Sequence, residues 1–271
     1  MLVSNTEKYK KYKPKKFLGQ NFLVDDNIAR KISRTVEFSK DDFVLEIGPG
    51  HGALTRYFTD YGDNYAAVEI DKSAFENLKE KYPKVNFIHK DFLKLDFIKD
   101  IPVIPSGNIK VIGNIPYNIT SEILFKLFDN RDYIHSAVLM VQKEVAQRLI
   151  AISDTKEYGI LAVQTQANCI PKILFSVPPT AFFPKPRVNS SVIKLDFRTV
   201  SFEISNYEHF RLLVRNAFGK RRKTIRNSLM GFFEEKGLSF ADFDFDFSRR
   251  AENLKVQEYI MLSQKITKLL G

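Results

Sequence analysis

The sequence predicts an α/β fold, in which a mostly parallel sheet carries helices on both faces and is followed by a small helical C-terminal domain. Short apolar runs alternate with helical stretches through most of the 271 residues. This alternation is typical of parallel strands that are joined by helices. It ends after Phe197, because residues 206–271 show helical periodicity, a Phe/Asp-rich loop (FADFDFDF) and no pair of strands. We therefore place a domain boundary near residue 200.

The parallel sheet is predicted from five apolar runs of strand length. These are Phe43–Ile47, Tyr65–Glu69, Val85–His89, Ile109–Gly113 and Ser136–Val141. Helices are expected between them at Ala53–Asp60, Lys72–Lys81 and Thr120–Phe128. Asp71 and Thr120 are suitable N-caps for the last two helices. A further strand is expected at Ser191–Phe197.

The composition excludes several classes of protein. Hydrophobic residues make up 44% and charged residues 27% of the chain, which allows a sizeable core and excludes a disordered or collagen-like chain. Cys169 is the only cysteine, so no intramolecular disulfide or cysteine-based zinc cluster can form, and a reducing, cytosolic setting is expected. The four histidines are scattered, which predicts no metal site. No apolar run reaches the roughly 18 residues of a membrane span, and the N-terminus lacks a secretory signal.

The net charge of +10 lies at the two ends of the chain. Residues 1–16 carry six Lys and one Glu, and residues 207–271 carry 13 basic and eight acidic side chains, so each end has a net charge of +5. The residues between them are neutral overall. This pattern indicates a core that holds a small molecule and flanks that bind a polyanion, with nucleic acid as the leading partner. An anionic membrane is the alternative, but neither end shows a strongly apolar amphipathic helix.

The first chemical motif is LEIGPGHGALT, residues 45–55, which follows a predicted strand and opens a predicted helix. Its glycines, Gly48, Gly50 and Gly52, permit a tight turn and a close approach of a ligand. Glu69 ends the next strand, 19 residues after Gly50, where its carboxylate can accept hydrogen bonds from both ribose hydroxyls. The spacing is not G-x-G-x-x-G, and the proline removes a backbone donor that a pyrophosphate would use. Both points favour a nucleoside without phosphates, such as S-adenosylmethionine, over a dinucleotide. The presence of Glu69 argues against a tight turn without a ligand.

Asp91 follows the third predicted strand, in IHKDFL. A carboxylate at the carboxyl end of a parallel strand can accept a hydrogen bond from an adenine amino group in the binding crevice. An Asp in this place can equally cap the next turn. Its position after the glycine motif and Glu69 favours the binding role.

The tetrapeptide Asn114-Ile115-Pro116-Tyr117 directly follows the fourth predicted strand. Methyl transfer to an aromatic amine requires that the nitrogen lone pair, which is delocalised into the ring, be localised for attack on a sulfonium methyl. The side-chain oxygen of Asn114 and the carbonyl of Ile115, whose direction Pro116 fixes, are acceptors for the amino hydrogens. Tyr117 offers a face on which the base can stack. A strand-ending turn alone would explain the Asn and the Pro but not the whole tetrapeptide.

A second source of aromatic side chains is AFFPKPRV, residues 181–188. Its prolines stiffen the loop, and Phe182 or Phe183 is suited to the other side of a base clamp. Lys185 and Arg187 would then meet the flanking phosphates. Since the chain has 24 Phe, we expect one of the two to be ordinary core.

The motifs stand in the same order as in the rRNA adenine N6-dimethyltransferases, and the resemblance spans residues 16 to about 260. They include KFLGQNFL (16–23), LEIGPGHGALT, the Glu69/Asp91 pair, NIPY, QKEVAQR (142–148) and FFPKPRVNSSV. NIPY and F-x-P-x-P-x-V are highly specific to this family. The chain is similar to its bacterial small-subunit type, which dimethylates two adjacent adenosines in the 3′-terminal hairpin loop of small-subunit (16S) rRNA.

The resemblance implies three segments and a set of site residues. Residues 1–16 would be a basic N-terminal tail, 17–200 a Rossmann-like S-adenosylmethionine-dependent methyltransferase domain and 201–271 a helical rRNA-binding domain. S-adenosylmethionine would contact Asn21, Leu23, Gly48, Glu69, Asp91 and Asn114. The target adenine would be held by Asn114, Tyr117 and Phe182. Ile115 stands where the family usually has leucine, and only its backbone should matter.

The C-terminal segment distinguishes two types of this family. RNAFGKRRKTIRNSL, residues 215–229, resembles the small-subunit type and not the macrolide-resistance type, which acts on large-subunit rRNA. Residues 211–226 carry seven basic side chains and no acidic one. Such unbalanced charge favours phosphate binding over a solvated helical face. The expected phosphate contacts are Lys220, Arg221, Arg222, Lys223 and Arg226.

The sequence therefore predicts an enzyme that uses S-adenosylmethionine and no metal, and that acts on small-subunit rRNA in the 30S particle or a precursor during ribosome biogenesis. We expect a cytoplasmic monomer without membrane contact. Two other classes stay open. A nucleotide-dependent oxidoreductase would share the glycine motif but would not need NIPY. A non-catalytic rRNA-binding assembly factor would share the charge pattern but need not keep Asn114 or Glu69.

Overall fold

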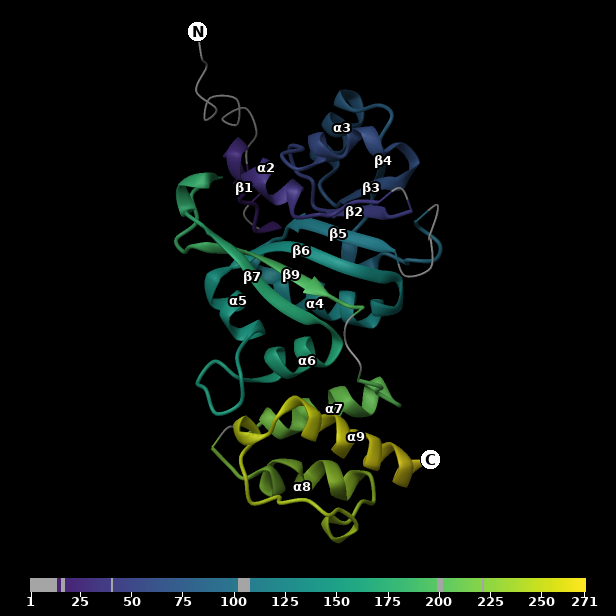
Figure 1. The fold of residues 1–271 in the computed structure, drawn as a ribbon, viewed down its shortest axis with the longest axis vertical. Helices are drawn as coiled ribbons and strands as arrows, with labels where there is room; N and C mark the ends of the chain where they lie inside the picture. Colours follow the sequence, from purple (N-terminus) through teal and green to yellow (C-terminus); the bar gives the residue numbers. More distant parts are fainter. Residues whose placement is uncertain (1–13, 16–17, 40, 102–107, 199–201, 221) are drawn as a thin grey trace. The chain divides into compact units, whose positions relative to one another are not determined.

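The computed structural model describes residues 14–15, 18–39, 41–101, 108–198, 202–220 and 222–271 (Figure 1). The chain divides into two compact units. Within the described ranges, the first unit comprises Met1–Ala146 and Lys172–Arg198, and the second comprises Gln147–Pro171 and Thr199–Gly271. Most of the predicted basic tail, residues 1–16, lies outside the described residues.

The first unit is built on a seven-stranded sheet. Its strands are β2 (Phe43–Ile47), β3 (Tyr65–Glu69), β4 (Asn86–His89), β5 (Ile109–Asn114), β6 (Ile134–Gln142), β7 (Ile170–Val177) and β9 (Ser190–Asp196). They lie in the order β4-β3-β2-β5-β6-β9-β7 (Figure 1). The strands from β4 to β6 are parallel, and β9 pairs antiparallel with β6. The predicted α/β class is confirmed, and β7 is an addition that the sequence did not predict.

Helices flank the sheet (Figure 1). They are α2 (Asp26–Arg34), α3 (Lys72–Lys81), α4 (Thr120–Asp129) and α5 (Lys143–Leu149), with 3₁₀ helices at Phe92–Lys94, Tyr117–Ile119, Arg131–Tyr133 and Pro179–Ala181. α2 begins after Asp25, whose side chain accepts hydrogen bonds from two backbone N–H groups of the first turn. Ala29 and Ile32 of α2 belong to the same core cluster as Val44 of β2. The helix therefore buries its apolar side against the sheet.

The structure confirms one predicted helix cap and corrects another. Asp71 caps α3 by accepting a hydrogen bond from the N–H of Ser73 at 3.0 Å. Thr120 is instead the first residue of α4, and its hydroxyl donates to the carbonyls of Pro116 and Tyr117 at 3.2 and 3.3 Å. The tight turn before α4 brings these carbonyls within reach of the hydroxyl. Thr120 thus holds the preceding turn and does not cap the helix that follows.

The α-helix predicted at Ala53–Asp60 is not formed. Two 3₁₀ helices, Thr55–Tyr57 and Thr59–Asn64, take its place. The apolar residues of the segment still pack into the core, where Leu54 and Phe58 are both buried. The Thr55 hydroxyl donates to Glu46 of β2 at 2.8 Å, so a side-chain contact holds the segment where a regular helical ladder was expected.

Two very short strands form a separate antiparallel sheet. β1 (Phe22–Leu23) pairs with β8 (Phe182–Phe183), with Phe22 opposite Phe183 and Leu23 opposite Phe182. This pairing joins residues 22–23 to the FFPKPRV loop. The sequence did not predict it, since two residues are too few to show a periodicity.

The second unit is helical in its described residues. Its helices are α6 (Ile160–Asn168), α7 (Tyr207–Phe218), α8 (Ile225–Glu235) and α9 (Val256–Leu270), with 3₁₀ helices at Phe240–Asp242 and Ala251–Asn253. One core cluster contains Val163 of α6, Phe210 of α7 and Tyr259 of α9. Packing therefore groups residues 147–171 with the C-terminal helices, whereas the sequence placed them before the boundary near residue 200. The functional division at residue 200 stays a prediction.

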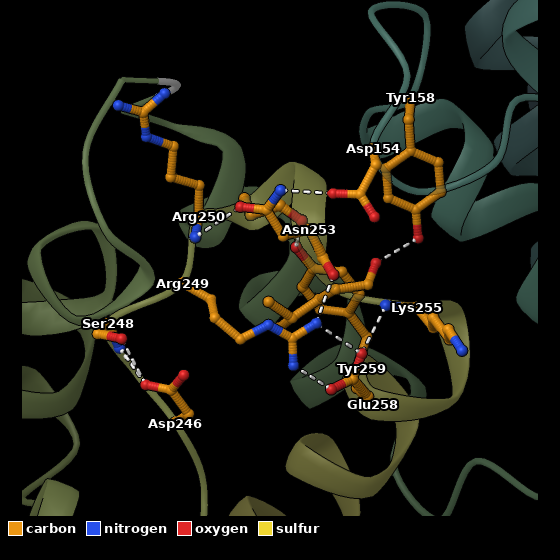
Figure 2. A network of polar contacts seen from close by, with 12 residues as sticks. Asp154, Tyr158, Asp246, Ser248, Arg249, Arg250, Asn253, Lys255, Glu258 and Tyr259 are labelled. Carbon is orange, nitrogen blue, oxygen red and sulfur yellow. Dashed lines mark hydrogen bonds and ion pairs between the residues drawn. The ribbon is translucent and has the colours of Figure 1, made fainter.

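A polar network supports the same grouping (Figure 2). The guanidinium of Arg249 donates to both carboxylate oxygens of Glu258 on α9, at 2.5 and 3.1 Å. The amide of Asn253 donates to the Asp154 carboxylate at 2.6 Å. Contacts of this kind tie the loop before α6 to the segment before α9. They explain why a loop from the middle of the sequence packs with the C-terminal helices.

One carboxylate is buried in the core of the first unit. Glu46 of β2 is 2% exposed, and its Oε2 accepts hydrogen bonds from the hydroxyls of Thr55, at 2.8 Å, and of Tyr65. Burial raises the pKa of Glu46 to about 7, although the two hydroxyls favour the charged form. The folded protein therefore binds this proton more tightly than the unfolded chain, in which the group titrates near 4.5. It follows that the unfolding free energy falls as the pH rises from about 4.5 to 7.

We predict that Glu46→Gln removes this part of the pH dependence. The wild type should lose about 2–3 kcal/mol of unfolding free energy through this group, because one unit of pKa is worth about 1.4 kcal/mol. Denaturant titrations at pH 5 and pH 8 measure the difference. Glu76→Gln, at an exposed glutamate of α3, is the matched control and should keep the wild-type dependence. An equally strong dependence in Glu46→Gln would contradict the assignment.

Candidate active site

A cavity of about 260 Å³ lies at the carboxyl ends of the parallel strands. Residues 18–23, 46–51, 68–70, 90–93 and 114–119 line it. The last four of these segments follow or end β2, β3, β4 and β5, which is where ligands bind in open α/β sheets. All of the residues that the resemblance assigns to the cofactor line this cavity. They are Asn21, Leu23, Gly48, Glu69, Asp91 and Asn114.

The glycine motif forms a tight turn that only glycine accommodates easily. Gly48 and Gly50 have φ angles of +62° and +57°, in the left-handed region. A Cβ on Gly50 would lie 3.1 Å from the ring of Phe22. The tight turn that the sequence predicted is therefore formed, and both glycines line the cavity.

Glu69 connects this turn to the end of β3. Its side chain is 4% exposed, Oε2 accepts from the N–H of Gly50 at 2.9 Å, and Oε1 accepts from the N–H of Asp71 at 2.8 Å. Burial raises the pKa of Glu69, and the two N–H donors oppose that shift. Each oxygen keeps a lone pair for a further donor, so the carboxylate is held in place without being saturated.

Asp91 caps the next turn and lines the cavity, and its role in binding a ligand stays a prediction. Its Oδ1 accepts a hydrogen bond from the N–H of Leu93 at 3.0 Å and so caps the short helix Phe92–Lys94. The residue also lines the cavity. Capping uses one oxygen of the carboxylate and leaves the other for a ligand.

Residues 18–23 form one wall of the cavity and are fixed at two points. Asp71 accepts hydrogen bonds from Nζ of Lys15 at 2.7 Å and from Nε2 of Gln20 at 3.1 Å. At the other point, Nδ2 of Asn114 donates to the carbonyl of Asn21 at 2.8 Å. Because this bond uses the amide nitrogen of Asn114, the amide oxygen is the atom left to accept a hydrogen bond from a ligand.

The NIPY turn is held from both sides. Tyr117 is half-buried and lines the cavity, and its hydroxyl lies 2.5 Å from Oγ of Ser190 on β9. The Thr120 hydroxyl bonds the backbone of the same turn. Burial raises the pKa of Tyr117, so its hydroxyl stays protonated near neutral pH. Ser190 was not predicted as a site residue, although it belongs to the FFPKPRVNSSV motif.

The two phenylalanines of this motif differ in exposure. Phe182 is 4% exposed, packs in the same core cluster as Leu23 and does not line the cavity. Phe183 is half-buried and lies opposite Phe22, which does line the cavity. Cross-strand neighbours share one face of a sheet, so Phe183 lies on the same side as Phe22. A stacking role for Phe182 stays a prediction, and so does the choice between the two.

The predicted phosphate-binding residues lie in the second unit. Lys220, Arg222 and Lys223 are exposed between α7 and α8, and Arg221 lies outside the described residues. Arg226 is exposed at the start of α8, with its guanidinium 4.8 Å from the ring centroid of Phe240. The exposure suits contact with a polyanion, but the role stays a prediction.

The described residues contain neither a metal-binding cluster nor a membrane-spanning helix. Among them, no group of three or more His, Cys, Asp or Glu side chains is arranged to hold a metal ion. No helix in the same part of the chain has the length and apolar character to cross a membrane.

Known proteins are similar to this chain in both sequence and fold. The family model described as ribosomal RNA adenine dimethylase matches residues 11–268. Ribosomal RNA small subunit methyltransferase A of Chlorobium phaeobacteroides is 44% identical over 255 residues, covering 94% of each chain. The protein of the same name from Chlorobaculum parvum is 46% identical over 253 residues, covering 93% of this chain and 89% of its own.

Two solved structures are similar over almost the whole chain. A dimethyladenosine transferase from Plasmodium falciparum gives a TM-score of 0.75 at 25% identity and covers 90% of this chain and 96% of its own. The 23S rRNA methyltransferase ErmE gives 0.64 at 25% identity and covers 91% of this chain and 100% of its own. The predicted family resemblance and methyltransferase fold are confirmed. The chain belongs to the ribosomal RNA adenine dimethylase family of methyltransferases.

Proposed function

We propose that the protein transfers methyl groups from S-adenosylmethionine to N6 of two adjacent adenosines in the 3′-terminal hairpin loop of small-subunit (16S) rRNA. The observation that carries this proposal is the Asn114 amide, which Asn21 holds with its oxygen available at the cavity. Membership of the family supports the reaction, and the relatives named as small-subunit methyltransferases support the substrate.

The residues around the cavity suit S-adenosylmethionine. Glu69 is held by two N–H donors and keeps lone pairs for the ribose hydroxyls. The second oxygen of Asp91 suits the adenine amino group, and Leu23 and Ile70 supply apolar surface for the ring. Because Gly48 has no Cβ, the rest of the S-adenosylmethionine molecule can approach the backbone there. When bound, the cofactor supplies an electrophilic methyl group on a sulfonium centre.

Asn114 and Ile115 would activate the methyl acceptor. The two amino hydrogens of the target adenine donate to Oδ1 of Asn114 and to the carbonyl of Ile115, which localises the nitrogen lone pair. The N–C bond forms as the S–C bond breaks, and the product amine then releases its proton to water. Tyr117 stacks on the base and keeps the nitrogen in line with the methyl group. The site therefore needs acceptors and a stacking face, and no strong base.

Exposed basic residues suit the phosphates of the RNA. They are Lys220, Arg222, Lys223 and Arg226 in the second unit, and Lys185 and Arg187 in the loop between β8 and β9. Arg221, which lies outside the described residues, is the remaining predicted phosphate contact. Such contacts position the RNA and account for most of the salt dependence of binding. We propose that the protein acts in the cytoplasm, as a monomer, on the 30S particle or a precursor.

Methylation of large-subunit rRNA is the second candidate function. The similarity of fold to the 23S rRNA methyltransferase ErmE favours it. The test is to incubate the protein and labelled S-adenosylmethionine with small and large subunits from a strain that lacks the small-subunit modification. We expect label at two adjacent adenosines of the small subunit only. Label in the large subunit would establish the second candidate, and no label in either would indicate a non-catalytic assembly factor.

We predict that Glu69→Ala weakens S-adenosylmethionine binding by about 1.5–3 kcal/mol, the range for hydrogen bonds to a charged group. Calorimetry measures the affinity, and melting curves show whether the loss of the Gly50 and Asp71 contacts unfolds the protein. Glu76→Gln on α3 is the control and should bind as the wild type does. Unchanged affinity in Glu69→Ala would mean that the ribose is held elsewhere.

We predict that Asn114→Ala lowers the single-turnover methylation rate by ~10²–10³, the usual effect of losing one preorganised polar contact to a transition state. RNA affinity should stay nearly intact, because the contact matters most as the amine reacts. Asn130→Ala, at the end of α4, is the matched control and should react at the wild-type rate. A near-normal rate in Asn114→Ala would exclude the proposed role of the amide.

We predict that alanine at Arg221, Arg222 and Lys223 together makes RNA binding less sensitive to salt. The slope of log affinity against log salt concentration should become shallower by roughly 2–3, since each phosphate contact contributes about 0.7–0.9 to it. Binding to small subunits at several salt concentrations measures the slope. Cofactor affinity should not change. Alanine at Lys72, Lys79 and Lys81, which are exposed on α3, removes the same charge from another surface and should leave the slope unaltered. A parallel line for the first triple variant would reject these phosphate contacts.

A further inference from the structure

The Tyr117 hydroxyl contacts a residue far from the NIPY motif in the sequence, Ser190 on β9. It lies 2.5 Å from Oγ of Ser190, and either oxygen can be the donor. Ser190 is 0% exposed, whereas the ring of Tyr117 reaches the cavity. The bond therefore runs from a fixed point in the sheet to a side chain at the site.

Ser190 is held by the pairing of its own strand. It is the first residue of β9 and lies opposite Gln142 at the end of β6. The preceding carbonyl, of Asn189, accepts a hydrogen bond from the N–H of Lys143 at 3.0 Å. The backbone from which the Ser190 hydroxyl extends is thus fixed to the sheet.

The other end of the Tyr117 side chain is held as well. Thr120, which is 3% exposed, donates to the backbone carbonyls of Pro116 and Tyr117. With the backbone fixed at one end and the hydroxyl at the other, the ring cannot swing about its Cα–Cβ bond. A stacking face held in this way loses little conformational freedom when a base arrives.

We infer that Ser190 is a positioning residue for the methyl acceptor: its hydroxyl holds the Tyr117 ring in the orientation in which it stacks on the target adenine. This inference rests on the proposed function, because it takes Tyr117 as the stacking residue. The bond also joins the NIPY turn to the end of the FFPKPRV loop. Lys185 and Arg187 of that loop are exposed. RNA bound to these two residues would therefore be aligned with the Tyr117 ring through Ser190.

The test removes each hydroxyl and then both. Ser190→Ala and Tyr117→Phe should each lower the single-turnover rate on small subunits roughly 3- to 10-fold, the fold-change that corresponds to one net hydrogen bond. The double variant should lose no more than either single variant, because the two changes delete the same bond. S-adenosylmethionine affinity and the subunit concentration that gives half the maximal rate should stay within about twofold of the wild type.

Ser191→Ala is the matched control. Ser191 is the next residue of β9 and is 1% exposed, and its Oγ has no hydrogen-bond partner among the described residues. The variant removes the same buried hydroxyl without touching Tyr117, and its rate should equal that of the wild type. A rate for Ser190→Ala that matches Ser191→Ala would overturn the inference. So would additive losses in the double variant, or a Ser190→Ala protein that has lost cofactor affinity or melts well below the control.

The outcomes also separate this inference from the function on which it rests. If the wild type methylates small subunits and Tyr117→Ala loses that activity while Ser190→Ala keeps it, only the positioning role fails. If the wild type transfers no methyl group to small subunits, the proposed function and the positioning role both fail.

Discussion

The hydrogen bond from the Asn114 amide to the Asn21 carbonyl is the contact on which the site depends. It joins the end of β5 to a segment that lies far away in the sequence, and it fixes which atom of the amide faces the cavity. Residues 18–23 are in turn held by Asp71 and by the pairing of β1 with β8. If this segment moved, the amide would lose its orientation and the cavity would lose a wall. One polar contact thus couples the shape of the cavity to the chemistry proposed for it.

The same principle recurs at the other polar side chains of the site. Glu69 is oriented by two backbone N–H groups and Asp91 by one, while the hydroxyl of Tyr117 is paired with Ser190. Each group is therefore held by the fold before a ligand arrives, which is what a reaction driven by acceptors and alignment requires. The exposed charges of Lys220, Arg222, Lys223 and Arg226 belong to the other compact unit. We therefore expect changes at these residues to leave cofactor binding intact.

The sequence predicted the parts that depend on local pattern. Every strand with a buried apolar run was found. Asp71 caps its helix because an Asp directly before a helix can accept a hydrogen bond from an N–H group of the first turn, here that of Ser73. Parts that depend on distant partners could not be predicted in this way. β1 and β8 have two residues each and exist only as a pair. Thr120 was expected to cap a helix, but its hydroxyl bonds the backbone of the preceding turn. The contact of Ser190 with Tyr117 depends on the pairing of strands that are distant in the sequence. The grouping of α6 with the C-terminal helices likewise depends on tertiary packing.

A crystal structure of the protein with S-adenosylhomocysteine and adenosine bound tests the account most directly. We expect the adenine N6 within hydrogen-bond distance of Oδ1 of Asn114, with Nδ2 still on the carbonyl of Asn21 and the Tyr117 ring stacked on the base. The S-adenosylhomocysteine molecule should lie along the cavity, with its own ribose beside Glu69. A structure in which N6 is out of reach of Asn114, or in which the amide has turned its nitrogen toward the base, would contradict the account.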